Sequence, residues 1–113
     1  MRKIYNSIIF YIFKGLAMKI TVKFLANMGI FMGIREINME LEDGKEYTVR
    51  DIVEKITQTS GKDLKGKVMD ETGQSTGRVR IIINGRDIVS LSKFDTKISD
   101  GDDISMFPAL GAG

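Results

Sequence analysis

The 113-residue sequence contains no cysteine and no histidine. Without cysteine the chain has no disulfide, no thiolate metal ligand and no thiol nucleophile. Without histidine it lacks the side chain that most often serves as a general base or as a metal ligand. Only carboxylates remain as metal-ligating side chains, and no metal site is predicted. These absences disfavour a self-sufficient hydrolase or redox enzyme and favour a cytoplasmic binding or carrier protein.

A strong excess of positive charge is also missing. Arg2, Lys3 and Lys14 lie in the first 17 residues, which leaves 14 basic and 15 acidic side chains in residues 18–113. These basic residues are scattered, and no arginine-rich stripe alternates with aromatic residues. Because nucleic-acid binding needs a clustered basic surface, none is predicted. The length fits one domain.

Long hydrophobic runs are absent, and the longest apolar stretch near the N-terminus is short. Residues 8–13 are apolar, and Lys14 follows them. A helix over residues 4–16 would span about 20 Å, less than the roughly 30 Å of a bilayer core. Three interpretations stay open for residues 1–17: an extension upstream of a start at Met18, which we favour, a weak membrane-surface anchor, or a cleaved signal. No membrane contact is expected for residues 18–113.

Two strands are predicted at the start of the domain. Residues 19–24 alternate between polar and apolar side chains, which is the period of a half-buried strand. Ile37, Met39 and Leu41 alternate in the same way with polar neighbours. About ten residues separate the two segments, and two glycines interrupt residues 27–33. We therefore expect an antiparallel hairpin with a wide loop.

One long helix is predicted after this hairpin. Residues 48–51 read Thr-Val-Arg-Asp, which has the form of a capping box with Asp in the position usually held by Glu or Gln. Apolar residues then recur at helical spacing and form one stripe: Val49, Ile52, Val53 and Ile56. Gly61 is expected to end the helix.

The next segment is predicted to be a long polar loop followed by another hairpin. Residues 62–77 show little periodicity, with a turn of helix expected at residues 64–69. Residues 78–83 are rich in β-branched side chains and are predicted to form a strand. The pair Asn84-Gly85 is typical of a tight turn with positive backbone angles, and a short strand is expected near Ile88.

The last strand is predicted at residues 103–107, after a turn at Asp100-Gly101. The order of elements is then ββαβ(β)β. The predicted fold class is α+β, with a mixed four- to five-stranded sheet covered on one face by one main helix.

Several residue groups that resemble sites are assigned structural roles. Asp100, Asp102 and Asp103 are predicted to shape a turn, because a calcium site needs more oxygen ligands in a defined loop. No site is assigned to the loop glycines Gly66, Gly73 and Gly77 or to the strand residues Glu36, Glu40 and Glu42.

Four segments together resemble the ubiquitin-like sulfur-carrier family. They are MKITVKFLA, YTVRDIVEKI, RIIINGRDI and DTKISDGDDISMFP, followed by a tail that ends in glycine. The family includes the small subunit of molybdopterin synthase and the thiamine-pathway sulfur carrier, and the long loop and IIINGRDI resemble the former more. The resemblance covers about residues 18–113. It implies a β-grasp (ubiquitin-like) domain over residues 18–107 and a reactive tail over residues 108–113, in agreement with the predicted order of elements.

The resemblance also implies how such a protein works. The carboxylate of Gly113 would be adenylated by a separate enzyme that uses ATP, and then converted to a thiocarboxylate that donates sulfur. This chain would be a carrier, not an enzyme, and would bind no cofactor. Five further residues would pass into the active site of the partner: Pro108, Ala109, Leu110, Gly111 and Ala112. Six extended residues from Pro108 reach at most about 20 Å.

Two partners follow from the resemblance: a ubiquitin-activating-like adenylyltransferase and the large subunit of molybdopterin synthase. Phe94, Met106, Phe107 and Leu110 suit either a core or an interface. Because Phe107 and Leu110 flank the tail, we predict that they contact the partner.

One position departs from the family pattern. Members usually end in Gly-Gly, whereas here Ala112 precedes the last glycine. The added methyl group could narrow the fit in a partner's channel. Alternative functions therefore stay open: sulfur supply for tRNA thiolation or thiamine, attachment to proteins as a modifier, or an adaptor without tail chemistry.

Overall fold

The computed structural model describes residues 17–110, so the predictions for residues 1–16 and 111–113 lie outside the described residues. Within that range no helix is long and apolar enough to cross a membrane. The elements, in chain order, are β1 (Met18–Phe24), α2 (Asn27–Met32), β2 (Glu36–Leu41), α3 (Val49–Ser60), α4 (Leu64–Val68), β3 (Val79–Ile83), β4 (Arg86–Asp87), the 3₁₀ turns η1 (Ile88–Ser90) and η2 (Lys93–Asp95), and β5 (Asp103–Pro108).

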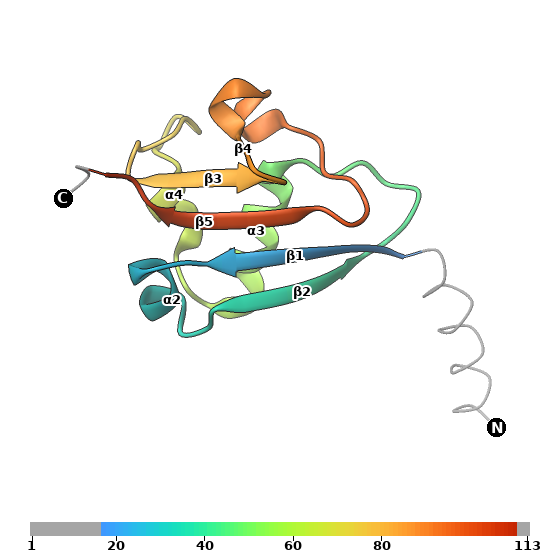
Figure 1. Ribbon diagram of the computed structural model, residues 1–113, viewed down its shortest axis with the longest axis horizontal. Helices are drawn as coiled ribbons and strands as arrows, with labels where there is room; N and C mark the ends of the chain where they lie inside the picture. Colours follow the sequence, from blue (N-terminus) through green and yellow to red (C-terminus); the bar gives the residue numbers. More distant parts are fainter. Residues whose placement is uncertain (1–16, 111–113) are drawn as a thin grey trace.

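The five strands form one mixed sheet in the order β2-β1-β5-β3-β4. The central pair, β1 and β5, is parallel, and the other pairs are antiparallel. Helix α3 lies across one face of this sheet (Figure 1). The predicted β-grasp fold, with four or five strands and one main helix, is confirmed.

The core lies between α3 and the sheet. The predicted apolar stripe of α3, Val49, Ile52, Val53 and Ile56, is fully buried. It faces the inward residues of the central strands, which include Val22, Phe24, Ile104 and Met106. Phe94 is also buried in this core. Alternate residues of each strand therefore point into the core between α3 and the sheet, which explains why apolar residues recur at every second position in the sequence.

Both ends of α3 have the predicted caps. The Thr48 hydroxyl accepts a hydrogen bond from the Asp51 backbone N–H at 3.3 Å, and the Asp51 carboxylate accepts one from the Thr48 N–H at 2.9 Å. This reciprocal pair is a capping box, and it supplies partners to two N–H groups that the helix itself leaves free. Gly61 ends the helix with a φ of 70°, in the left-handed region that favours glycine.

The capping box gives a first stability prediction. Thr48→Ala should lower the free energy of unfolding by about 1 kcal/mol, because it leaves the Asp51 N–H without its acceptor. Thr59→Ala is the matched control, since Thr59 lies in the last turn of the same helix and its hydroxyl bonds to the Lys55 carbonyl. Urea unfolding of both variants measures the difference. Equal losses in the two would contradict a specific role for the cap.

The predicted wide loop between the first two strands is wrong in part, because it contains helix α2. Met28 and Met32 lie one turn apart on the same side of α2, and both are buried. No side chain caps the start of this helix, and Gly33 ends it with a φ of 72°. Burial of the two methionines, rather than local sequence, therefore stabilises α2.

The predicted short strand near Ile88 is confirmed. The strand is β4, which ends at Asp87, and Ile88 begins η1. The Asp87 carboxylate accepts a hydrogen bond from the Val89 N–H at 2.9 Å and so caps this turn. The preceding Asn84-Gly85 turn is confirmed, with φ values of 49° and 84°.

Candidate functional site

The tail leaves the domain from the centre of the sheet. Strand β5 lies between β1 and β3, and its residues Ile104 and Met106 are fully buried. Pro108 pairs with Val79 of β3, and the Ala109 N–H donates to the Arg78 carbonyl at 3.0 Å. The base of the tail is thus held by the most deeply packed strand, so the direction in which the tail leaves is fixed.

The structure describes only the first part of the predicted tail. Pro108 and Ala109 are half-buried, whereas Leu110 is fully exposed. Gly111, Ala112 and Gly113 lie outside the described residues. The exposure of the Leu110 side chain excludes a place for it in the core, and its interface role stays a prediction.

Phe107 lies beside two exposed apolar residues that the sequence analysis missed. Phe107 follows the buried Met106, and Leu25 follows the buried Phe24, so alternation places both on the sheet face away from α3. The Leu25 N–H donates to the Met106 carbonyl at 2.9 Å, which places it next to β5. The Phe24 N–H donates to the Arg35 carbonyl at 2.8 Å, which brings Ile34, the residue before Arg35, close to the end of β1.

We call Leu25, Ile34 and Phe107 the tail-side surface. Leu25 is 45% exposed and Ile34 46%, whereas Phe107 is half-buried. Figure 1 shows that α2 and the C-terminal end of β5 lie at the same end of the sheet. Three apolar side chains are therefore accessible near the end of the sheet from which the tail leaves.

Most of the rest of this face is polar, with the half-buried Ile82 of β3 as an apolar exception. Thr21 donates a hydrogen bond to Asn38 at 3.2 Å, and Lys23 forms an ion pair with Asp103 at 3.3 Å. Arg80 lies opposite Phe107 in the β3–β5 pair. The exposed apolar side chains are therefore concentrated at the tail end of the open face.

Arg80 is held by Asp87 through two donors. Its Nε and Nη2 atoms lie 2.9 and 2.5 Å from one carboxylate oxygen of Asp87. The pKa of the Asp87 carboxyl is lowered, first by the hydrogen bond from the Val89 N–H and then by Arg80, although partial burial opposes this. The negative charge on Asp87 is thus stabilised in the folded state.

This lowered pKa predicts how stability depends on pH. Because the folded-state pKa lies below the unfolded value of about 3.9, Asp87 stabilises the fold above that pH and loses its contribution as the pH falls through the folded pKa. Asp87→Asn should therefore cost about 1 kcal/mol at pH 7 and less at about pH 3, where the unfolded carboxyl is already largely protonated. Urea unfolding at both pH values measures this. A cost that stays constant with pH would exclude a role for the charge.

The acidic cluster of residues 100–103 has the predicted structural role. Asp102 is buried and accepts hydrogen bonds from the Ser99 N–H and the Asn84 amide, both at 2.8 Å. Asp100 accepts one from the Lys19 N–H at 2.7 Å. These carboxylates fix the turn before β5. Within residues 17–110 no group of three acidic side chains is placed to hold a metal ion.

Residues 28–113 match the ThiS family. The chain is 28% identical over 71 residues to a candidate sulfur carrier protein of Archaeoglobus fulgidus, a match that covers 63% of this chain and 80% of that one. It is 27% identical over 96 residues to small archaeal modifier protein 3 of Haloferax volcanii, covering 85% and 100%.

A solved structure from Pyrococcus furiosus, named as a candidate molybdopterin converting factor subunit 1, is 30% identical. The similarity covers 82% of this chain and 99% of that one, with a TM-score of 0.62. The family match covers most of the domain and reaches Gly113, and the solved structure shares its fold. The chain belongs to the ThiS family of ubiquitin-like sulfur carriers and modifiers.

Proposed function

We propose that this chain is a cytoplasmic sulfur carrier whose reactive group is the carboxylate of Gly113. A carboxylate oxygen attacks the α-phosphorus of ATP, and pyrophosphate leaves. A hydrosulfide equivalent from a donor then attacks the carbonyl carbon, and AMP leaves, which produces the thiocarboxylate. A separate activating enzyme binds the ATP and performs both steps, so the carrier itself needs no catalytic base.

One structural observation supports this proposal above the others. The tail begins on the central strand β5, whose inward residues are fully buried, and Leu110 is exposed immediately after the last backbone contact at Ala109. A rigid base positions the tail relative to the partner, and the side-chain-poor end can enter a narrow channel. Pro108 to Ala112 are the residues assigned to that passage.

The tail-side surface is proposed to dock on the same partner. A protein that receives the tail must cover the face from which the tail leaves. Leu25, Ile34 and Phe107 offer apolar contacts there, and Leu110 extends them into the tail. Apolar anchors near the centre of an interface usually contribute most of its binding energy.

Among sulfur-transfer pathways, we propose a role as the small subunit of molybdopterin synthase, bound to a large catalytic subunit. The likeness to the Pyrococcus furiosus protein supports this assignment. Sulfur supply for tRNA thiolation or thiamine uses the same carrier chemistry and is the alternative. The likeness to small archaeal modifier protein 3 favours a second function, in which a lysine amine instead of sulfur attacks the activated carbonyl carbon.

The test combines two measurements on the purified full chain. Intact mass after incubation with the activating enzyme, ATP and a sulfur donor should show that one oxygen has been replaced by sulfur. Affinity capture from cells then identifies the pathway: recovery of a molybdopterin synthase large subunit supports the proposed role, and isopeptide-linked proteins support the modifier function. No mass change, together with partners that bind equally well without residues 111–113, would establish an adaptor.

A further inference from the structure

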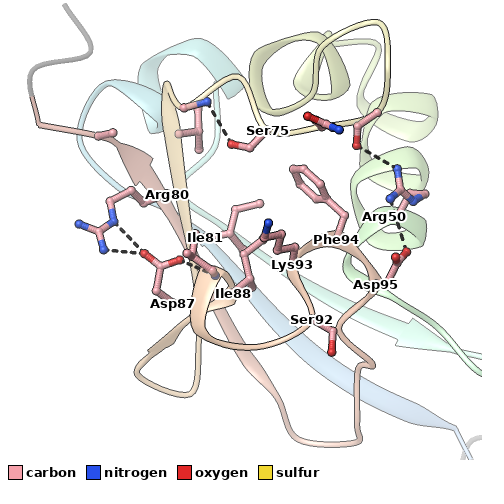
Figure 2. Close-up of a pocket in the computed structure, with 16 residues that line it drawn as sticks. Arg50, Ser75, Arg80, Ile81, Asp87, Ile88, Ser92, Lys93, Phe94 and Asp95 are labelled. Carbon is pink, nitrogen blue, oxygen red and sulfur yellow. Dashed lines mark hydrogen bonds and ion pairs between the residues drawn. The ribbon is translucent and has the colours of Figure 1, made fainter.

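A pocket that the proposed function does not use lies beside the base of the tail. It has a volume of about 720 Å³ and lies between β3, the loop over residues 73–77 and the segment over residues 87–95 (Figure 2). Ala109 forms part of its rim. A volume of this size accommodates a small organic molecule.

The inner wall of the pocket is apolar and well packed. Ile81, Ile88 and Phe94 line it, and each is at least 94% buried because it also belongs to the core. Such side chains keep their positions, so the wall is preformed. The more exposed Val89 and Ala109 also line the pocket and offer apolar surface to a ligand.

Two of the three cations that line the pocket already have acidic partners. Arg50 lies 3.4 Å from Asp95, donates to the Gly73 carbonyl at 3.3 Å and stacks over the Phe94 ring at 5.7 Å. Arg80 is paired with Asp87. These contacts neutralise both guanidinium groups and hold the walls of the pocket together.

Lys93 is the third cation, and it has no acidic partner among residues 17–110. Figure 2 shows its side chain extending into the pocket, with the amino group between Ile81 and Phe94 in that view. Its backbone φ is 53°, in the left-handed region that a lysine rarely adopts. Strained backbone of this kind is concentrated at binding sites.

We propose that this pocket binds a small monocarboxylate with an apolar body. The apolar part contacts Val89 and Ala109 over the buried wall, and the carboxylate pairs with the Lys93 ammonium group. One uncompensated positive charge matches a carboxylate better than a phosphate dianion. The site does not depend on the sulfur chemistry, so it would persist if the proposed function were wrong.

The test uses benzoate as the probe and the amide NMR spectrum of the full ¹⁵N-labelled chain as the readout. Benzoate should shift the amides of Ser75, Ile88 and Phe94 in a saturable way at constant ionic strength. Acetate, which lacks the ring, and benzyl alcohol, which lacks the charge, should both bind more weakly. Shifts that do not saturate, or equal binding of benzyl alcohol, would overturn the proposal.

Matched lysine variants test the role of the charge. Lys93→Met should weaken benzoate binding about tenfold, because it removes one charge-assisted hydrogen bond. Lys93→Arg should retain binding, because it keeps the positive charge. Since both variants change the same strained position, retained binding in Lys93→Arg would show that the loss in Lys93→Met comes from the charge and not from a folding defect. Lys62→Met is the control, since Lys62 is exposed but lies outside the pocket. Equal affinity of Lys93→Met and the wild type would contradict the proposal.

A last comparison identifies the source of the carboxylate. The chain ends four residues after Ala109, a distance of at most about 14 Å when extended. If its own terminal carboxylate occupies the pocket, a chain whose Gly113 carboxylate is converted to a carboxamide, which keeps the length and removes the charge, should bind benzoate more strongly. Unchanged affinity of the carboxamide chain supports a ligand that is free in solution.

Discussion

Deletion of Gly113 is expected to abolish both adenylation and thiocarboxylate formation. The deletion leaves Ala112 at the end, so the terminal carboxylate lies one residue short of the nucleotide, by about 3.5 Å. A displacement of this size takes the reacting oxygen out of attack distance. Pyrophosphate release measures adenylation, and intact mass measures the exchange of oxygen for sulfur.

The same deletion should leave the fold unchanged. The buried side chains of β5 end at Met106, and Ala109 makes the last backbone contact within the described residues. The urea midpoint of the shortened chain should therefore equal that of the full chain. Full activity without Gly113 would refute the proposed reactive group, and lost stability would show that the tail packs on the domain.

Ala112→Gly separates the chemistry of the terminus from the fit of the tail. If the Ala112 methyl group crowds the partner's channel, its removal should increase the rate of adenylation without changing stability. A wild-type chain that is never adenylated by the enzyme of its own organism, while the Ala112→Gly variant is, would show that the natural tail has lost its chemistry. The adaptor function would then be favoured.

Much of the fold could be predicted because local signals and tertiary packing agree. The alternation over residues 19–24 places Ile20, Val22 and Phe24 in the core, and the capping box at Thr48 starts α3 where predicted. Helix α2 could not be predicted, since it has no side-chain cap and depends on the burial of Met28 and Met32. That burial exists only once the sheet has formed.

Only the part of the candidate site whose residues are adjacent in the sequence could be predicted. The tail and Phe107 adjoin each other in sequence, so their association needs no tertiary information. Leu25 was missed although the sequence contains a signal for it. Lys19, Thr21 and Lys23 are the outward-facing positions of β1, and Leu25 is the next position in this alternation, one residue after the strand, yet it is apolar. An apolar residue in an exposed phase indicates an interface.

The pocket beside the tail was not predictable in this way. Arg50, Ser75 and Lys93 come from α3, a loop and η2, and their proximity depends on how these segments pack against β3. The positive φ of Lys93 has no signature in the sequence, because glycine or asparagine is the usual residue there. Three-dimensional contacts, rather than motifs, therefore define this site.

Leu25→Glu is expected to raise the KM of the activating enzyme for the carrier at least about thirtyfold, with kcat nearly unchanged. A charge at the centre of the tail-side surface removes an apolar anchor and leaves an unpaired carboxylate in the interface, a loss of roughly 2 kcal/mol or more. The tail is intact in this variant, so a bound carrier still presents Gly113. A rise in KM with an unchanged kcat indicates that the variant has lost binding energy that the wild type has equally in the bound ground state and in the transition state.

Two further variants show whether the effect is local. Ile34→Glu should raise KM in the same direction, because Ile34 lies on the same surface. Val89→Glu is the matched control: Val89 is apolar and 69% exposed, but it lies in η1, beyond β4 at the edge of the sheet. Urea unfolding of all three variants checks the fold. Equal effects of Leu25→Glu and Val89→Glu would mean that the tail-side surface is not the docking site, even if Gly113 proves reactive.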